Sequence, residues 1–107
     1  MVFLLGKGVA GMDESALTVN AQHCRHYISE AIRCFRLGME PLGNDNLVKF
    51  ADYLLPLLGS NANLYGASDN QLLESIFAAQ TRGDFAYLAD LLQYEIPLSG
   101  IGDLLYG

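Results

Sequence analysis

The amino-acid sequence predicts an all-α fold, a four-helix antiparallel bundle built from two similar helix hairpins. Apolar residues recur every three or four positions over long stretches, and glycine and proline clusters separate these stretches. The chain of 107 residues is 51% hydrophobic and 17% charged, a composition that excludes intrinsic disorder. We expect one helical domain over residues 13–107, with hairpins 13–59 and 68–107. Residues 1–12 are expected to be a flexible arm or a wrongly assigned start.

The first predicted helix carries a long, regular apolar stripe. Its members follow one another at spacings of four and three: Leu17, Ala21, Cys24, Ile28, Ala31, Phe35, Gly38 and Leu42. This heptad-like spacing places them on one helix face, which we interpret as the core-facing side. Asp13 or Ser15 is predicted to cap the start of the helix, and Pro41 with Gly43 is predicted to end it.

A second helix is predicted between a turn and cap at residues 43–45 and an end at Gly59. Its apolar positions cover more than half of its circumference: Leu47, Val48, Phe50, Ala51, Leu54, Leu55, Leu57 and Leu58. Pro56 lacks a backbone N–H, so we expect it to kink or shorten the last turn.

The third and fourth helices are predicted from their capping residues. Ser68 and Gln71 have the spacing of a capping box, and Gly83 is expected to end the third helix. Asp84 is predicted to cap the fourth helix, and Pro97 to break it. The tail, residues 101–106, is apolar enough that we expect it to dock on the bundle.

An apparent repeat links the two predicted hairpins. The pattern Pro-Leu-x-Gly-x4-Leu-Tyr-Gly occurs at residues 56–66 and again at 97–107. It predicts that each hairpin closes with a Pro-Leu-x-Gly turn and an apolar Leu-Tyr tip, and chance similarity is the alternative. Tyrosine with exposed leucine is common at protein interfaces. We therefore predict an interface formed by Tyr53, Leu57, Leu64, Tyr65, Tyr94, Leu98, Leu105 and Tyr106, with packing inside the bundle as the competing interpretation.

The charge of −6 is unevenly distributed along the chain. Residues 15–39 carry three arginines and one acid, whereas residues 40–107 carry nine acids and two bases. This balance argues against nucleic-acid binding, which needs clustered lysines and arginines. Arg25, Arg33 and Arg36 are predicted to pack beside acidic helices of the same domain, or to form a basic face for an acidic partner.

One residue set has the side-chain types of a metal site. His23, His26 and Glu30 lie near one side of the first helix, and two imidazoles with a carboxylate could ligate a transition metal. No second ligand cluster completes the site, so solvated residues on the polar face are the favoured interpretation. Cys24 and Cys34 would be about 15 Å apart along that helix, so we expect reduced thiols. No catalytic constellation is found, and no cofactor is expected.

The segment at residues 83–97, Gly-Asp-Phe-Ala-Tyr-Leu-Ala-Asp-Leu-Leu-Gln-Tyr-Glu-Ile-Pro, resembles a known C-terminal signature. The signature is that of an uncharacterised bacterial family of small helical proteins, with the pattern G-D-Y-x-x-L-A-D-L-L-x-Y-E-L-x-P. This chain has Phe85 where the family usually has tyrosine. The resemblance implies an all-α protein and offers no catalytic residues.

These observations together predict a cytoplasmic, non-catalytic protein-interaction or adaptor domain. Its partner is expected to be another protein or a second copy, with a homodimer favoured. The alternative is a small metal- or ligand-binding helical protein that uses the face of His23, His26 and Glu30. No membrane span is expected, because the longest uninterrupted apolar run is far shorter than the roughly 20 residues a span needs.

Overall fold

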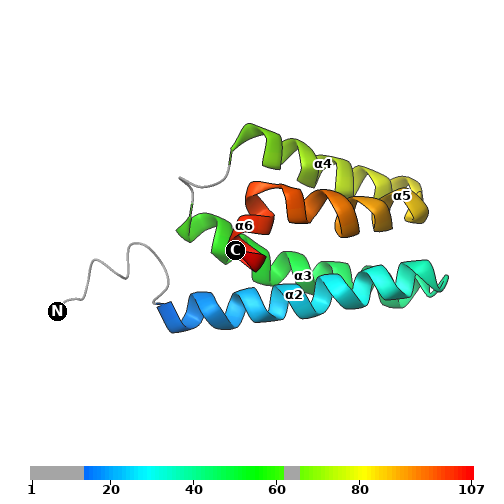
Figure 1. The fold of residues 1–107 in the computed structure, drawn as a ribbon. Helices are drawn as coiled ribbons and strands as arrows, with labels where there is room; N and C mark the ends of the chain where they lie inside the picture. The colour runs from blue at the N-terminus through cyan, green and yellow to red at the C-terminus, as the bar shows by residue number, and fades with distance from the viewer. Residues whose placement is uncertain (1–13, 62–65) are drawn as a thin grey trace.

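The structure, a computed structural model, describes residues 14–61 and 66–107, and all regular structure within them is helical (Figure 1). The predicted all-α class is confirmed. The α-helices are α2 (Glu14–Arg36), α3 (Glu40–Ser60), α4 (Ala67–Arg82), α5 (Phe85–Asp90) and α6 (Gly100–Tyr106). A π-helical segment, η2 (Leu91–Glu95), and a 3-10 turn, η3 (Ile96–Leu98), join α5 to α6. The predicted arm, residues 1–12, lies outside the described residues.

Helices α2 and α3 lie side by side and run in opposite directions (Figure 1). The part of the predicted stripe that lies in α2 faces the core, where Cys24, Ile28 and Ala31 are almost completely buried. The last two members of the stripe, Gly38 and Leu42, lie beyond α2 and are exposed, so the prediction is wrong for them. Two of the three buried side chains are small, which lets the backbone of α3 approach closely. The Cys24 thiol accordingly lies 3.8 Å from the Phe50 carbonyl oxygen, to which it donates.

Helix α2 ends at Arg36, earlier than the sequence predicts, because Gly38 adopts the left-handed conformation with φ +76°. The Met39 N–H donates to the Cys34 carbonyl at 2.8 Å, and the Gly38 N–H donates to the Phe35 carbonyl at 3.2 Å. This pair of bonds is a Schellman motif, which satisfies the last carbonyls of a helix. Pro41 then lies in the first turn of α3, where an intrahelical N–H is not required. The prediction that Pro41 ends a helix is therefore wrong.

Gly43 also differs from its prediction as a turn residue. It is buried within α3, where a Cβ atom would lie 2.6 Å from Cδ1 of Phe35. The glycine is therefore required by a tertiary contact rather than by a turn. The Phe35 ring stacks in turn on Phe85, with ring centroids 5.2 Å apart, so this contact also joins α2 to the start of α5.

Helix α4 packs against α5 and η2 and is anchored by one carboxylate. The predicted capping box of Ser68 and Gln71 is wrong, because Gly66 is the N-cap and the reciprocal residue is Asp69. Oδ2 of Asp69 accepts a hydrogen bond from the Gly66 N–H at 3.0 Å. Its Oδ1 accepts from the N–H of Gly100, the first residue of α6, at 2.9 Å. Asp69 thus joins the starts of two helices, and its side chain is buried.

The turn from α4 to α5 is as predicted. Gly83 ends α4 in the left-handed conformation with φ +75°, and Asp84 caps α5 by accepting from the Tyr87 N–H at 3.3 Å. The helix then widens, since the Ile96 N–H donates to the Leu91 carbonyl, five residues back. Pro97, which follows, has no N–H to continue an α-helical ladder. The chain becomes extended at Ser99, whose hydroxyl oxygen accepts from the Gly102 N–H at the start of α6.

The sequence repeat does not correspond to a structural repeat in the described residues. Pro56 lies inside α3, which continues to Ser60, whereas Pro97 lies in the short turn η3. The exposed fraction is 3% for Leu57 but 84% for its counterpart Leu98. The predicted Pro-Leu-x-Gly turn is therefore absent at residues 56–59, where the helical hydrogen bonds of α3 continue past the proline.

The C-terminal tail docks on the bundle as α6. Ile101 and Leu105 are buried, and Nη1 of Arg25 donates to the Leu105 carbonyl oxygen at 2.6 Å. Burial of two large aliphatic side chains stabilises this short helix, which would be marginal alone.

Replacing Gly43 by alanine tests the contact with Phe35. We expect Gly43→Ala to lower the free energy of unfolding by about 1–3 kcal/mol, because the ring or the helix must shift. Gly59→Ala is the matched control in the same helix, since a Cβ there would meet no atom within 4 Å. It should leave stability unchanged or raise it by up to about 1 kcal/mol. Equal effects of the two variants in urea unfolding would contradict the proposed role of the contact.

Replacing Asp69 by asparagine tests the junction of α4 and α6. An amide group offers one acceptor oxygen where the carboxylate offers two, so we expect Asp69→Asn to cost about 1–3 kcal/mol of unfolding free energy. Asp52→Asn, at an exposed position of α3, is the control and should change stability by less than about 0.5 kcal/mol. Thermal unfolding followed by circular dichroism measures both variants, and a neutral Asp69→Asn would refute the junction.

Candidate interaction surfaces

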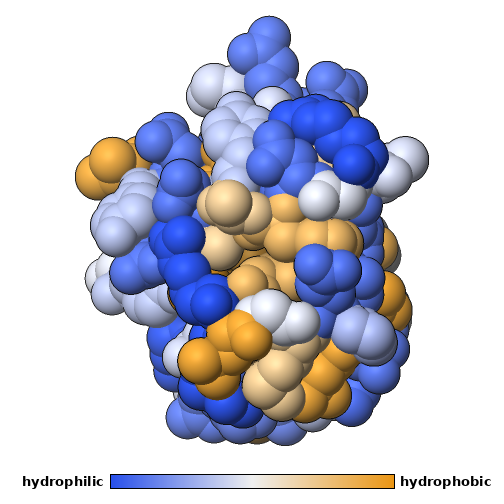
Figure 2. All heavy atoms as spheres, turned by 90° about the vertical axis from the view of Figure 1, so that its right-hand side faces the viewer, coloured by the Kyte–Doolittle hydropathy of each residue, from blue (hydrophilic) through white to orange (hydrophobic). Residues whose placement is uncertain are grey.

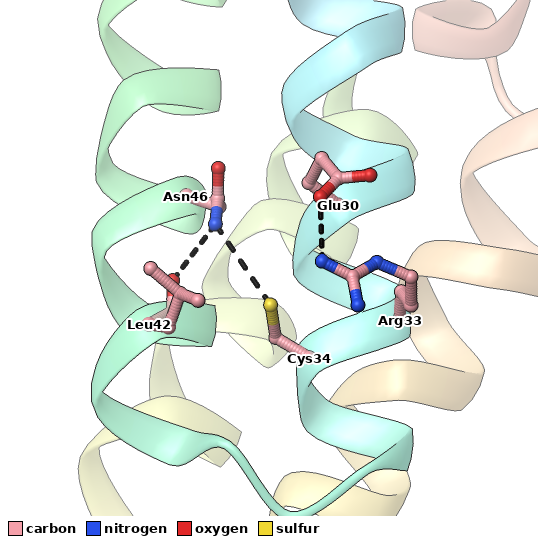
Figure 3. Close-up of polar contacts among 5 residues, drawn as sticks. All are labelled: Glu30, Arg33, Cys34, Leu42 and Asn46. Carbon is pink, nitrogen blue, oxygen red and sulfur yellow. Dashed lines mark hydrogen bonds and ion pairs between the residues drawn. The ribbon is translucent and has the colours of Figure 1, made fainter.

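The three residues of the metal hypothesis have other partners. The carboxylate of Glu30 accepts a hydrogen bond from Nη2 of Arg33 at 2.8 Å, and this bond lowers the pKa of Glu30 (Figure 3). The His23 ring stacks on Tyr53, with centroids 4.4 Å apart, and His26 meets the edge of Tyr27 at 5.0 Å. Within residues 14–61 and 66–107, no group of three or more histidine, cysteine and acidic side chains is placed to hold a metal ion.

Tyr53 belongs to an aromatic cluster that joins α2 to α3. Its ring lies 5.7 Å from that of Tyr27 and nearly parallel to it, and it also stacks with the ring of His23. Nζ of Lys49 lies 5.6 Å from the centre of the Tyr27 ring, close enough for a cation–π contact. Tyr53 is thus half-buried in packing between two helices of the domain.

The arginines of the predicted basic face are used within the domain. Arg25 donates to the carbonyl of Leu105, and Arg33 pairs with Glu30 one turn away. Nη2 of Arg36 lies 2.7 Å from Oδ1 of Asp90 and also donates to the side chain of Gln93. Arg36 therefore joins α2 to the second half of the chain.

Both cysteines are buried thiols. Burial raises the pKa of Cys24 to about 12, so its thiolate is not populated at neutral pH. Cys34 faces α3, where Nδ2 of Asn46 lies 4.0 Å from its Sγ and donates to the Leu42 carbonyl at 2.9 Å (Figure 3). A nucleophilic cysteine has a lowered pKa and an accessible sulfur, whereas the pKa of Cys24 is raised and both thiols are buried.

The predicted interface residues lie in different environments. Leu57 and Leu105 are in the core, with exposed fractions of 3% and 2%, because α3 and α6 turn them inward. The prediction that these two leucines belong to an interface is therefore wrong. Leu64 and Tyr65 fall outside the described residues. Tyr94, Leu98 and Tyr106 are exposed.

Tyr94 and Leu98 lie along one groove between α4 and the run from α5 to η3. It consists of a hollow of about 520 Å³ and a smaller one of about 270 Å³, which share Ser68, Leu72 and Glu95. We call it the α4–α5 groove and define it by Ser68, Asp69, Gln71, Leu72, Ser75, Tyr87, Asp90, Leu91, Tyr94, Glu95, Leu98, Ser99 and Gly100. The spacing of Tyr87, Leu91, Tyr94 and Leu98 could have indicated this wall from the sequence.

A second surface lies at the end of the molecule that carries the α2–α3 turn. Figure 2 shows apolar side chains gathered across this end, with polar groups around them. Its exposed members Leu37, Met39 and Leu42 have exposed fractions of 62%, 39% and 43%. Beside them is a hollow of about 450 Å³ lined by Phe35, Arg36, Glu40, Gly83, Asp84, Phe85 and Ala86. We call these ten residues the apolar end.

Comparisons of the chain with protein families, with curated proteins and with solved structures found no match. Across the described residues, no helix combines the length and the apolar character needed to cross a membrane. The two surfaces must therefore be interpreted from their own chemistry.

Burial of both thiols predicts slow reaction with a thiol reagent. In the native protein, Cys24 and Cys34 should react with a thiol-specific chromogenic reagent at least about a hundredfold more slowly than in denaturant. The time course of absorbance measures the two rates. Rapid labelling of one thiol per chain under native conditions would contradict the burial described above.

Proposed function

We propose that this chain is a non-catalytic protein-interaction domain that self-associates through the apolar end. The observation that carries this proposal is the cluster of Leu37, Met39 and Leu42, large apolar side chains exposed together beside a hollow that contains the stacked rings of Phe35 and Phe85. Exposed apolar patches with polar rims are typical of protein contact sites.

The rim of the apolar end favours a second copy as the occupant. It carries both signs of charge, since Arg36, Glu40 and Asp84 line the hollow, and Arg82, just outside it, lies 3.6 Å from Asp84. A two-fold axis that brought Arg36 of one copy opposite Glu40 of the other would form the same charge pair twice, in addition to the pair that Arg36 makes with Asp90. Such a self-complementary arrangement is what a symmetric dimer interface requires.

The proposal extends to the architecture and setting of the domain. In it, α2 with α3 and α4 with α5 and η2 form the two hairpins of an antiparallel four-helix bundle, and α6 is an added segment. It also places the protein in the bacterial cytoplasm and relates it to the uncharacterised family that residues 83–97 resemble. A metal-binding function is not proposed, because Glu30 and His23 are engaged by Arg33 and Tyr53.

Sedimentation velocity tests the proposed self-association. At tens of micromolar, we expect the protein to sediment as a species heavier than the 11.7 kDa monomer. Leu37→Ser should weaken self-association by at least about tenfold, because it removes the most exposed leucine of the apolar end. A strictly monomeric profile would overturn the proposal.

Leu55→Ser is the matched control for this experiment. Leu55 has the same exposed fraction as Leu37, 62%, but lies in α3 away from the turn. It should leave the sedimentation profile unchanged. If both variants weakened self-association equally, the contact would not be specific to the apolar end.

A further inference from the structure

The α4–α5 groove has the shape of a site for one helix. One wall is formed by α4 and the other by the continuous run α5, η2 and η3. Exposed Tyr87, Tyr94 and Leu98 recur along the second wall, and Leu72 and Leu91 contribute apolar surface between the walls. From Tyr87 to Leu98 the wall is about 16 Å long, or roughly three helical turns. The π-helical segment η2 lies in the middle of this wall, and such segments are frequent at functional sites.

The charge of the groove is one-sided. Asp90 and Glu95 line its main hollow, and no lysine, arginine or histidine is among its defining residues. Residues 66–107 contain six acids and a single base, Arg82. Asp90 is already paired with Arg36, whereas Glu95 is exposed and has no ion pair in the described part of the chain. Glu95 is therefore available to a cation brought by a ligand.

The tyrosines suit the same kind of ligand. The guanidinium carbon of Arg82 lies 5.5 Å from the centre of the Tyr87 ring, so a cation is already held on one aromatic face of this wall. Tyr94, 56% exposed, presents a second ring next to Glu95. A carboxylate beside an aromatic face attracts lysine and arginine by charge and by cation–π contact.

We propose that the α4–α5 groove binds a basic amphipathic helix from another protein. The inference rests on the proposed function only in taking the chain to be an interaction domain, and it does not depend on self-association. A second copy does not fit as the occupant, because none of its helices presents several bases that lack a partner. The three arginines of α2 are engaged within their own domain, and α3 and α4 carry one base each, Lys49 and Arg82. Residues 1–13 do not fit either, because Lys7 is their single base. The helix would set leucine-like side chains against Leu72 and Leu98 and lysines against Glu95.

Fluorescence anisotropy with a designed peptide tests this proposal. The probe is a labelled amphipathic helix of about 14 residues with leucines on one face and lysines flanking them. A counterpart with every lysine replaced by glutamate is the reference. We expect the basic peptide to bind at micromolar concentrations, at least about tenfold more tightly than the acidic one. Its affinity should fall as the salt concentration rises.

Two variants locate the binding at the groove. Glu95→Lys should lower the affinity for the basic peptide by at least about tenfold. Leu98→Ser should lower the affinity for both peptides, because it removes a side chain that is 84% exposed and does not support the core. Glu74→Lys makes the same charge change at an exposed position of α4 outside the groove, and should change affinity by less than about threefold.

Equal binding of the two peptides, equal effects of Glu95→Lys and Glu74→Lys, or no binding of the basic peptide at hundreds of micromolar would each overturn the proposal. Sedimentation of Glu95→Lys separates this result from the proposed function. If the protein self-associates but does not bind the peptide, only the groove inference fails. If the protein is a monomer that binds the peptide, only the proposed self-association fails.

Discussion

The buried carboxylate of Asp69 determines how the second half of the chain is arranged. It accepts hydrogen bonds from the Gly66 N–H and from the Gly100 N–H, so one side chain holds the first turn of α4 against the first residue of α6. A buried charge is costly unless it is well hydrogen-bonded, and a helix N-terminus supplies donors and a favourable dipole. Helix α6 is then held at its other end by Arg25, which donates to the Leu105 carbonyl from α2. These contacts join α4 to α6, and α6 to α2.

The α4–α5 groove depends on this junction for its width. Asp69, Ser99 and Gly100 line its smaller hollow, so the bond from Gly100 to Asp69 fixes the separation of the two walls at that end. At the other end, Gly83 and Asp84 set the turn that returns the chain toward α4. At both ends of the groove, an aspartate side chain therefore accepts a hydrogen bond from a backbone N–H, and these bonds fix the positions of the two walls.

Local chemistry made much of the fold predictable, and tertiary contacts explain where the predictions were wrong. The apolar period of α2 and the caps at Gly83 and Asp84 depend on neighbours in sequence, and they were predicted correctly. Gly43 was misinterpreted because its requirement is a ring that lies across the interface with α2. For the surfaces, Tyr94 and Leu98 were predicted from residue type. Leu37 and Glu95 were missed, since exposure depends on where helices end and which faces they cover.

The guanidinium of Arg36 belongs to both surfaces, because it lines the hollow of the apolar end and pairs with Asp90 of the α4–α5 groove. A cation that bound in the groove and drew Asp90 toward itself would change the charge presented at the rim of the apolar end. Occupancy of one surface would then alter affinity at the other, and by the same factor in both directions. Exposed ion pairs are worth at most about 1 kcal/mol, so this coupling is limited to about fivefold. Arg36 would thus couple binding at the two surfaces weakly.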